Sequence, residues 1–297
     1  MTMAKQLSSL IKVCVCGMMV LSGAVSCEKM NVEDDGEDLM DSNVVLHVGS
    51  IEQIPFGVAT RATLEDICTR LNFHVYDDQG MRVDYVNQKL GDAGFGTASF
   101  LLDKGHYFLV VVAHNGSQNP SFKKEEIVSI SGDNLGDTFW CSKDFEVGDD
   151  KVNLNLELQR IVAMLRFIPT VTPPKDLNKI LIKYKGSKGT FNGLTGYGRQ
   201  GNQTVSLFPN PEDRQYEFYM IPQTEEDEID ISFTGYNVDD NDVIIPLGGC
   251  SIDGVPMRRN SITICKGDLF NGDDKSASVF ITVSIDDSWG DNIQINI

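Results

Sequence analysis

The chain has 297 residues, a formal net charge of −18 at pH 7 and 41% hydrophobic residues. Phosphate backbones bind to clustered lysines and arginines, so this excess of acids excludes nucleic acid as a partner. The hydrophobic content is sufficient for packed cores, and the length suits two domains of ordinary size.

The chain begins with the pattern of an export signal. Lys5 and Lys12 precede an apolar run, Val13–Val25, which is shorter than the ~20 residues that a membrane-spanning helix needs. Ala24-Val25-Ser26-Cys27 follows the pattern of the lipobox of bacterial lipoproteins, with Ala24 in place of the usual leucine. This resemblance implies that residues 1–26 are a lipoprotein signal peptide. Cys27 would then be acylated, become the first mature residue and tether the chain to a membrane.

An acidic segment follows the cysteine. Residues 28–43 contain seven acids and one lysine, which predicts a solvated linker over residues 27–43. In Bacteroidetes-type lipoproteins such a segment resembles the signal that directs a protein to the outer face of the outer membrane. The resemblance therefore implies a lipid-anchored, surface-exposed location.

From Asn43 onward, side chains alternate with a period of two. Leu71–Tyr76 and Val152–Leu158 alternate as half-buried strands do, and Tyr107–Ala113 is apolar throughout, as in a central strand covered on both faces. Short helices are expected near Ser121–Ile127 and Lys175–Lys179.

The second half repeats this pattern, with strands separated by Gly, Asn, Asp and Pro turns. Its expected strands are Ile161–Phe167, Ile180–Tyr184, Thr204–Phe208, Tyr216–Ile221, Glu228–Thr234, Val243–Ile245, Ser261–Ile264, Val279–Ile285 and Ile293–Ile297. The chain is therefore expected to be all-β, with two tandem β-sandwich domains over residues 44–159 and 160–297.

The cysteines leave two alternatives open. Cys68 with Cys141, and Cys250 with Cys265, would each form a disulfide within one expected domain of an exported chain. The alternative is four free thiols buried in strands. No pair has the short spacing of a zinc or redox site.

The sequence contains no recognisable catalytic or metal-binding motif. The histidines, His47, His74, His106 and His114, fit strand and turn positions, and the last two lie at opposite ends of one strand. Asp239–Asp242 lacks the donor spacing of a calcium loop and is expected to be a hairpin turn. The glycine-rich run Gly193–Gly198 lacks the strand–turn–helix context of a dinucleotide site. We therefore expect no enzyme activity, no cofactor and no metal.

Several segments together resemble the fimbrial proteins of the Bacteroidetes, fimbrillin-like stalk subunits and, more closely, lipoprotein anchor and accessory subunits. The segments are Leu71–Gly80, Leu102–Asn115, Leu158–Phe167, Tyr219–Pro222 and Arg259–Gly267. The resemblance implies Greek-key, transthyretin-like sandwiches and a structural role in a surface filament. It also implies as partners other fimbrial subunits, the outer membrane through the N-terminal lipid, and a host or bacterial surface ligand.

The resemblance also suggests a cleavage site and a donor strand. Stalk subunits of the family are trimmed after an arginine, and Arg61 lies in a suitable segment, although it also fits an exposed loop. Ile293, Ile295 and Ile297 alternate in a segment that is either a donor strand for a neighbouring subunit or the closing strand of its own domain. The sequence does not distinguish anchor, tip and stalk subunits.

We therefore expect a lipid-anchored structural subunit of a fimbrium that assembles by strand complementation and supports adhesion. The alternative is a surface glycan-binding lipoprotein of a polysaccharide uptake system, which would stack exposed aromatic side chains on sugars. Only Trp140 and Trp289 could provide a tryptophan for that purpose.

Overall fold

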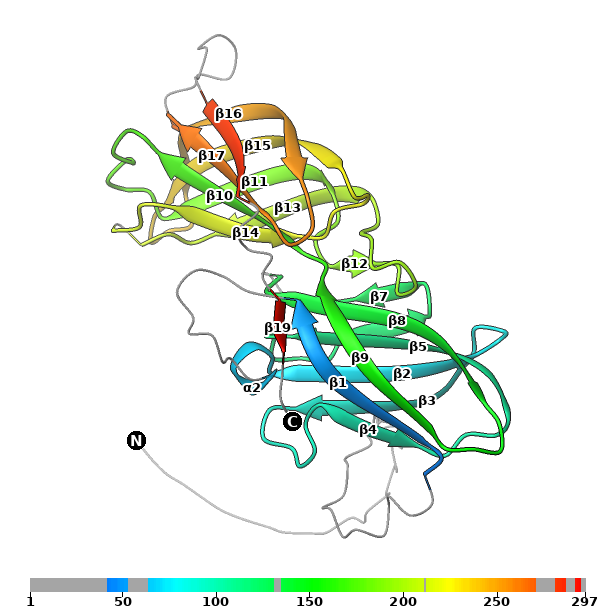
Figure 1. Ribbon diagram of the computed structural model, residues 1–297. Coiled ribbons are helices and arrows are strands. Elements are labelled where there is room, and N and C mark those ends of the chain that lie inside the picture. Colours follow the sequence, from blue (N-terminus) through cyan, green and yellow to red (C-terminus); the bar gives the residue numbers. More distant parts are fainter. Residues whose placement is uncertain are drawn as a thin grey trace, which may run out of the picture.

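The computed structural model describes residues 42–52, 64–130, 135–210, 212–270, 281–286 and 292–294. Within these residues the chain consists almost wholly of strands and turns, and its one helix is the four-residue α2 (Leu64–Ile67). The all-β expectation is therefore confirmed. Figure 1 shows two large groups of strands, one above the other, with short strands between them.

The first group is an eight-stranded sheet in the order β19-β1-β9-β8-β5-β2-β3, with β4 also paired to β1. Its strands are β1 (Val44–Glu52), β2 (Arg70–Asp77), β3 (Arg82–Lys89), β4 (Thr97–Phe100), β5 (Gly105–His114), β8 (Thr138–Val147), β9 (Val152–Arg160) and β19 (Asn292–Gln294). Strands β8 and β9 pair at only two positions. The sheet therefore separates into two layers, which enclose a core that includes Leu46, Phe73, Val111 and Leu158.

The second group is two four-stranded sheets in the orders β14-β10-β17-β18 and β13-β11-β15-β16. The first contains β10 (Ala163–Pro169), β14 (Tyr216–Met220), β17 (Ile262–Gly267) and β18 (Ile281–Asp286), and the second contains β11 (Lys179–Gly186), β13 (Gly201–Leu207), β15 (Asp227–Val238) and β16 (Ile244–Met257). Side chains from both sheets, such as Phe167, Ile182 and Phe233, share one buried cluster. The two sheets therefore form a sandwich.

A small sheet in the order β12-β7-β6 lies between the two groups, formed by β6 (Ser121–Lys124), β7 (Ile127–Ser129) and β12 (Thr190–Phe191). The helix expected near Ser121–Ile127 is therefore wrong. The β6–β7 hairpin instead places the Phe122 ring on His74, with 3.5 Å between ring centres, and buries Val128. Burial between distant segments outweighs the weak helix preference of so short a stretch.

The helix expected near Lys175–Lys179 is also wrong. These residues form a turn, and β11 begins at Lys179. The backbone N–H of Asn178 donates to the carbonyl of Tyr236, and Leu177 is buried in the core. Pairing with β15 therefore determines the conformation of this segment.

Most of the remaining strand expectations agree with the structure, but β16 continues to Met257, well beyond the expected Val243–Ile245. Residues 279–280 and 295–297 of two expected strands lie outside the described residues. Strand β5 is buried on both faces over most of its length, and β9 alternates between exposed and covered side chains, as predicted. Strand β2, expected to be half-buried, has six consecutive buried residues. The second face of β2 is covered because the β6–β7 hairpin packs on it.

The two groups share one arrangement of strands. In each, the first strand lies between one antiparallel and one parallel neighbour: β1 between β4 and β9, and β10 between β14 and β17. Strand β9 ends at Arg160 and β10 begins at Ala163. The division into domains at residues 159–160 stays a prediction, and β12 and β19 each pair with strands of the first half.

Candidate assembly site

Strand β1 is the first described strand, yet it lies in the interior of its sheet. Seven residue pairs join it in parallel to β9, from Val44↔Val152 to Ile51↔Leu158, with a bulge after Val48. On its other edge, four antiparallel pairs join Val44–His47 to β4. Both backbone edges of β1 are therefore occupied over much of its length.

The inward side chains of β1 are fully buried. Val44, Leu46 and Ile51 are completely covered, and Val48 is 1% exposed. Burying an aliphatic side chain contributes roughly 1.5–3 kcal/mol, so these four contribute on the order of 8 kcal/mol. Without β1, the edges of β9 and β4 would be unpaired and the core would be open between them.

The connectivity of β1 differs from that of β10, its counterpart in the second sandwich. No described element precedes β1, so a single cut between β1 and α2 separates it from every other described strand. Strand β10 is joined to described strands on both sides. Of these two equivalent interior strands, only β1 could be exchanged or removed by one cut.

The C-terminal strand β19 pairs with this same strand. Three antiparallel pairs, Ser50↔Gln294, Ile51↔Ile293 and Glu52↔Asn292, place it beside β1 (Figure 1). The C-terminal segment therefore reaches the sheet of the first half and does not close the sandwich of its own half. The role of this segment as a donor strand stays a prediction.

The predicted site residues are only partly within the described structure. Cys27, Arg61, Ile295 and Ile297 lie outside the described residues, and Ile293 is described only by its place in β19. Among the residues that the structure describes, no helix is long and apolar enough to cross a membrane. The lipid-attachment and cleavage predictions therefore stay predictions.

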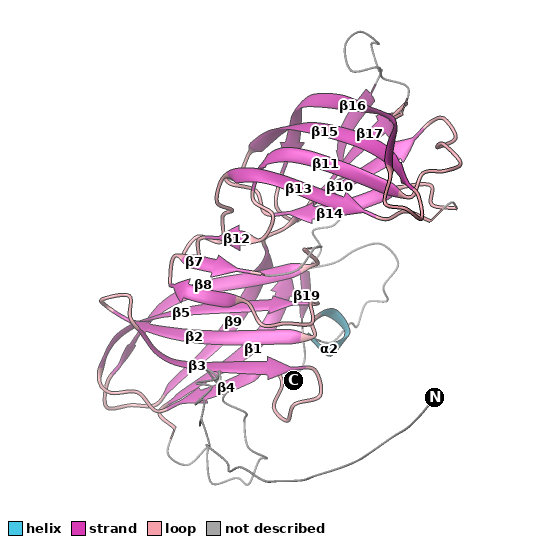
Figure 2. Ribbon diagram, turned by 180° about the vertical axis from the view of Figure 1, so that it is seen from behind, coloured by secondary structure: helices cyan, strands magenta, loops and turns pink. Residues whose placement is uncertain are grey.

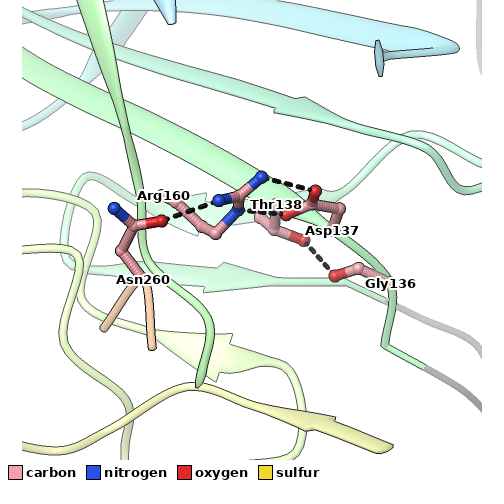
Figure 3. A network of polar contacts seen from close by, with 5 residues as sticks. All are labelled: Gly136, Asp137, Thr138, Arg160 and Asn260. Atoms are coloured by element: carbon pink, nitrogen blue, oxygen red, sulfur yellow. Dashed lines mark hydrogen bonds and ion pairs between the residues drawn. The ribbon is translucent and has the colours of Figure 1, made fainter. Parts of the chain in front are cut away.

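A buried ion pair joins the two groups of strands next to this site (Figure 3). The guanidinium of Arg160 at the end of β9 donates from Nε to Oδ1 of Asp137 (2.7 Å) and from Nη2 to Oδ2 (2.9 Å). Its Nη1 donates to Oδ1 of Asn260 (2.6 Å), in the turn between β16 and β17. The Arg160 side chain is fully buried. Its ion pair and hydrogen bond therefore connect the end of β9, the residue before β8 and the turn between β16 and β17.

Sequence reasoning missed this network, although a signal for it existed. Leu154, Leu156 and Leu158 occupy the inward phase of the alternating strand β9, and Arg160 continues that phase. A charged residue at an inward position requires a buried partner. The identity of that partner could not be read from the sequence, since Asn260 is 100 residues away.

The glycine-rich run Gly193–Gly198 is a turn that packs on Trp140. The Trp140 indole N–H donates to the carbonyl of Gly193 (2.6 Å). Gly196 has a φ of +69°, and a Cβ there would lie 2.8 Å from the Trp140 ring. Arg259 lies over the ring of Tyr197 and donates to the carbonyl of Thr195. Trp140 is 9% exposed, so it offers no surface on which a sugar could stack.

The four described cysteines are free thiols, as in the second of the two alternatives, and neither candidate disulfide is formed in this structure. Burial raises the pKa of Cys141 and Cys265 to about 12 and that of Cys250 to about 11. The pKa of Cys68 is also raised, first by burial and then by the nearby Asp137 carboxylate. Raised pKa values of this size oppose nucleophilic chemistry.

The histidines have separate environments. His47 hydrogen-bonds to Thr97, and His106 and His114 are at opposite ends of β5. Burial lowers the pKa of His74 to about 3 and that of His114 to about 4. Within the described part of the chain, no three His, Cys, Asp or Glu side chains are grouped so that they could hold a metal ion.

The turn before β16 has the expected conformation. Oδ1 of Asp239 accepts hydrogen bonds from the backbone N–H groups of Asn241 and Val243, which lowers the pKa of this carboxyl. Asp242 has a φ of +61°. The Asp239 carboxylate therefore stabilises a hairpin turn, in agreement with the sequence expectation.

Comparison with protein families gives one match. Residues 119–297 match the model described as "Family of unknown function (DUF6562)". The chain belongs to this family. The matched DUF6562 region begins just before β6 and includes β8, β9 and the whole second group of strands. No curated protein is significantly similar to the chain.

Solved structures with a similar arrangement include fimbrial proteins of the Bacteroidetes. The tip fimbrial protein Mfa3 of Porphyromonas gingivalis is 15% identical, with a TM-score of 0.40 and coverage of 82% of this chain and 98% of Mfa3. The fimbrial anchor protein Mfa2 of the same organism is 10% identical, with a TM-score of 0.44 and coverage of 85% and 99%. A candidate adhesin of Bacteroides thetaiotaomicron is 13% identical, with a TM-score of 0.48 and coverage of 86% and 98%.

Proposed function

We propose that this DUF6562 chain is a lipid-anchored structural subunit of a cell-surface fimbrium, an anchor or accessory subunit that supports adhesion. The observation that carries the proposal is the position of β1, an interior strand that one cut can separate from all other described strands. A strand with this connectivity can be removed, and a strand of another subunit can take its place in the sheet.

Assembly would use the C-terminal segment as the donor. Its three described pairs with β1 form a short contact, and the strand contains no charged residue or proline that would oppose pairing elsewhere. In the filament, this segment would leave its own β1 and pair with the sheet of a neighbouring subunit. Main-chain hydrogen bonds would then provide the affinity. Alternate isoleucines of the donor would fill the core of the neighbouring subunit where its own β1 has been removed.

The N-terminal segment would determine how the subunit is held at the cell surface. Acyl groups on Cys27 would hold the subunit in the outer membrane, and the acidic linker would extend from it by self-repulsion. An anchor would retain Cys27 and β1. Cleavage after Arg61 would remove both and produce a stalk subunit with an open groove between β9 and β4.

The proposal is tested by filaments purified from bacteria that produce the chain and from a deletion strain. The chain should co-purify with filaments from the producing strain, and deletion should reduce the number of filaments or release them from the cell. A chain that never accompanies filaments, together with unchanged filaments in the deletion strain, would falsify the proposal. Saturable binding of the chain to a purified polysaccharide, with no filament association, would favour the glycan-binding alternative.

A further inference from the structure

The sheet β13-β11-β15-β16 has two edges of different character. Figure 2 shows its four strands side by side, with β13 and β16 at the ends. An edge strand has backbone N–H and C=O groups that no strand of its own sheet pairs. Proteins that must avoid edge-to-edge contacts protect such strands with prolines, bulges or charges.

Strand β16 has all three kinds of protection. Pro246 and Pro256 lack the N–H that a new strand would need, and Asp253 adds an exposed charge. Its pairing with β15 has two register shifts, and Gly248 has a φ of +107°. This edge is therefore unsuited to pairing with a further strand.

Strand β13 has no such protection. It pairs with β11 over seven residues without a register shift, and its outward side chains, Asn202, Thr204 and Ser206, are uncharged. The run from Gln200 to Asn210 contains no charged residue, in a chain with a net charge of −18. Among the edge strands that the structure describes, β13 is the only one longer than four residues without a charge or a proline.

We propose that β13 pairs antiparallel with β13 of a second copy of this chain. Pairing centred on Thr204 places that threonine opposite itself and Asn202 opposite Ser206 of the second copy, so hydroxyl and amide groups face each other. The side chain of Phe208, which is 73% exposed, would then cover backbone of the second copy near Gln200. The product is a continuous eight-stranded sheet with a two-fold axis.

Charge favours a second copy at this edge. Two chains that each carry −18 repel one another wherever acids approach, and β13 contributes none. The neighbouring strand β11 exposes Lys183 and Lys185, which lie opposite Thr204 and Asn202 in the strand register. Their positive charges offset part of the negative potential of the chain near this edge. Self-association should therefore strengthen as salt screens the repulsion between the rest of the two chains.

This contact is distinct from the assembly site at β1. It joins subunits side by side through the second sandwich, whereas complementation at β1 joins them through the first. Loss of one should leave the other intact, so failure of this inference and failure of the proposed function are separate results.

Sedimentation velocity of the purified protein tests the inference. The protein should change from monomer to dimer between about 1 µM and about 1 mM, with a larger dimer fraction at higher salt. Thr204→Lys places two like charges opposite each other and should weaken dimerisation at least about tenfold. Ser251→Lys, on the protected edge of the same sheet, is the matched control and should leave dimerisation unchanged.

A cysteine variant makes the test independent of folding defects in Thr204→Lys. Thr204→Cys should form a covalent dimer under mild oxidation because residues directly opposite in an antiparallel pair have Cβ atoms about 5 Å apart. Ser251→Cys should not. A wild-type protein that stays monomeric over the whole concentration range would overturn the inference. A dimer that survives in folded Thr204→Lys and resists cross-linking in Thr204→Cys would also do so.

Discussion

Arg160 donates a 2.6 Å hydrogen bond to Asn260, although 100 residues separate them in the chain. The same guanidinium is paired through two nitrogens with Asp137, and it lies over the ring of Phe139 with its Cζ 4.9 Å from the ring centre. One side chain at the end of β9 thus connects the start of β8 with the turn between β16 and β17. The two halves of the chain are held together by a polar contact in addition to their shared apolar cluster.

Removal of one member of this ion pair should be costly. Arg160→Ala leaves Asp137 without its buried cation and should lower the free energy of unfolding by about 3–5 kcal/mol, measured by urea denaturation. Lys104→Ala, which breaks an exposed ion pair with Asp149, is the control and should cost less than about 1 kcal/mol. A loss for Arg160→Ala no larger than that of the control would show that the buried pair does not hold the junction.

Acid should destabilise the protein through two buried histidines. The folded-state pKa is about 3 for His74 and about 4 for His114, both below the ordinary value of 6.5, chiefly because burial disfavours the charged ring. In the folded protein both rings are neutral, so the free energy of unfolding is not reduced by these histidines above about pH 6.5. As the pH falls from 6.5 toward the folded-state pKa values, protonation of the unfolded chain lowers the free energy of unfolding. Between about pH 7.5 and about pH 5, each histidine should reduce the free energy of unfolding by about 2 kcal/mol.

Urea denaturation at the two pH values measures this loss. The difference should shrink by roughly half in His74→Asn and should persist in His106→Asn, whose side chain is 48% exposed. An undiminished pH difference in a variant that lacks both buried histidines would refute this explanation.

Gly196 should tolerate no side chain. Its φ of +69° strains any L residue, and a Cβ would lie 2.8 Å from a Trp140 ring that is fixed by its bond to Gly193. Gly196→Ala should therefore lower the free energy of unfolding by about 2–4 kcal/mol. Gly148→Ala, where a Cβ meets nothing within 4 Å, should be close to neutral. Equal stability of the two variants would contradict the described packing on Trp140.

The sequence predicted most strands because alternation is a local property. Val152–Leu158 and Tyr107–Ala113 could be identified from their own side chains, with their burial on one face or on both. The hairpin at Ser121–Ser129 could not, because its conformation depends on contacts with β2 and β12 that are distant in sequence. For the same reason, alternation identifies the C-terminal segment as a strand but does not predict its pairing with β1.

The N-terminus of the protein isolated from cells should be acylated Cys27, as the lipobox resemblance implies. Mass spectrometry of the N-terminal peptide distinguishes the alternatives. An N-terminus at Ala62 would indicate cleavage after Arg61 and a stalk subunit, and an intact Met1 would contradict the lipoprotein interpretation. Cys27→Ser should abolish acylation and reduce the amount of protein retained in the outer membrane.

The most direct test of strand complementation is incorporation of a shortened chain into filaments. A variant without residues 292–297 should still reach the cell surface, because Cys27 is unchanged and β1 keeps its pairing with β9 and β4, but it should be absent from purified filaments. Replacement of Ile293, Ile295 and Ile297 by valine retains strand preference and should preserve incorporation. Equal incorporation of the shortened and full-length chains would contradict the account, because the C-terminal strand would then not be the donor.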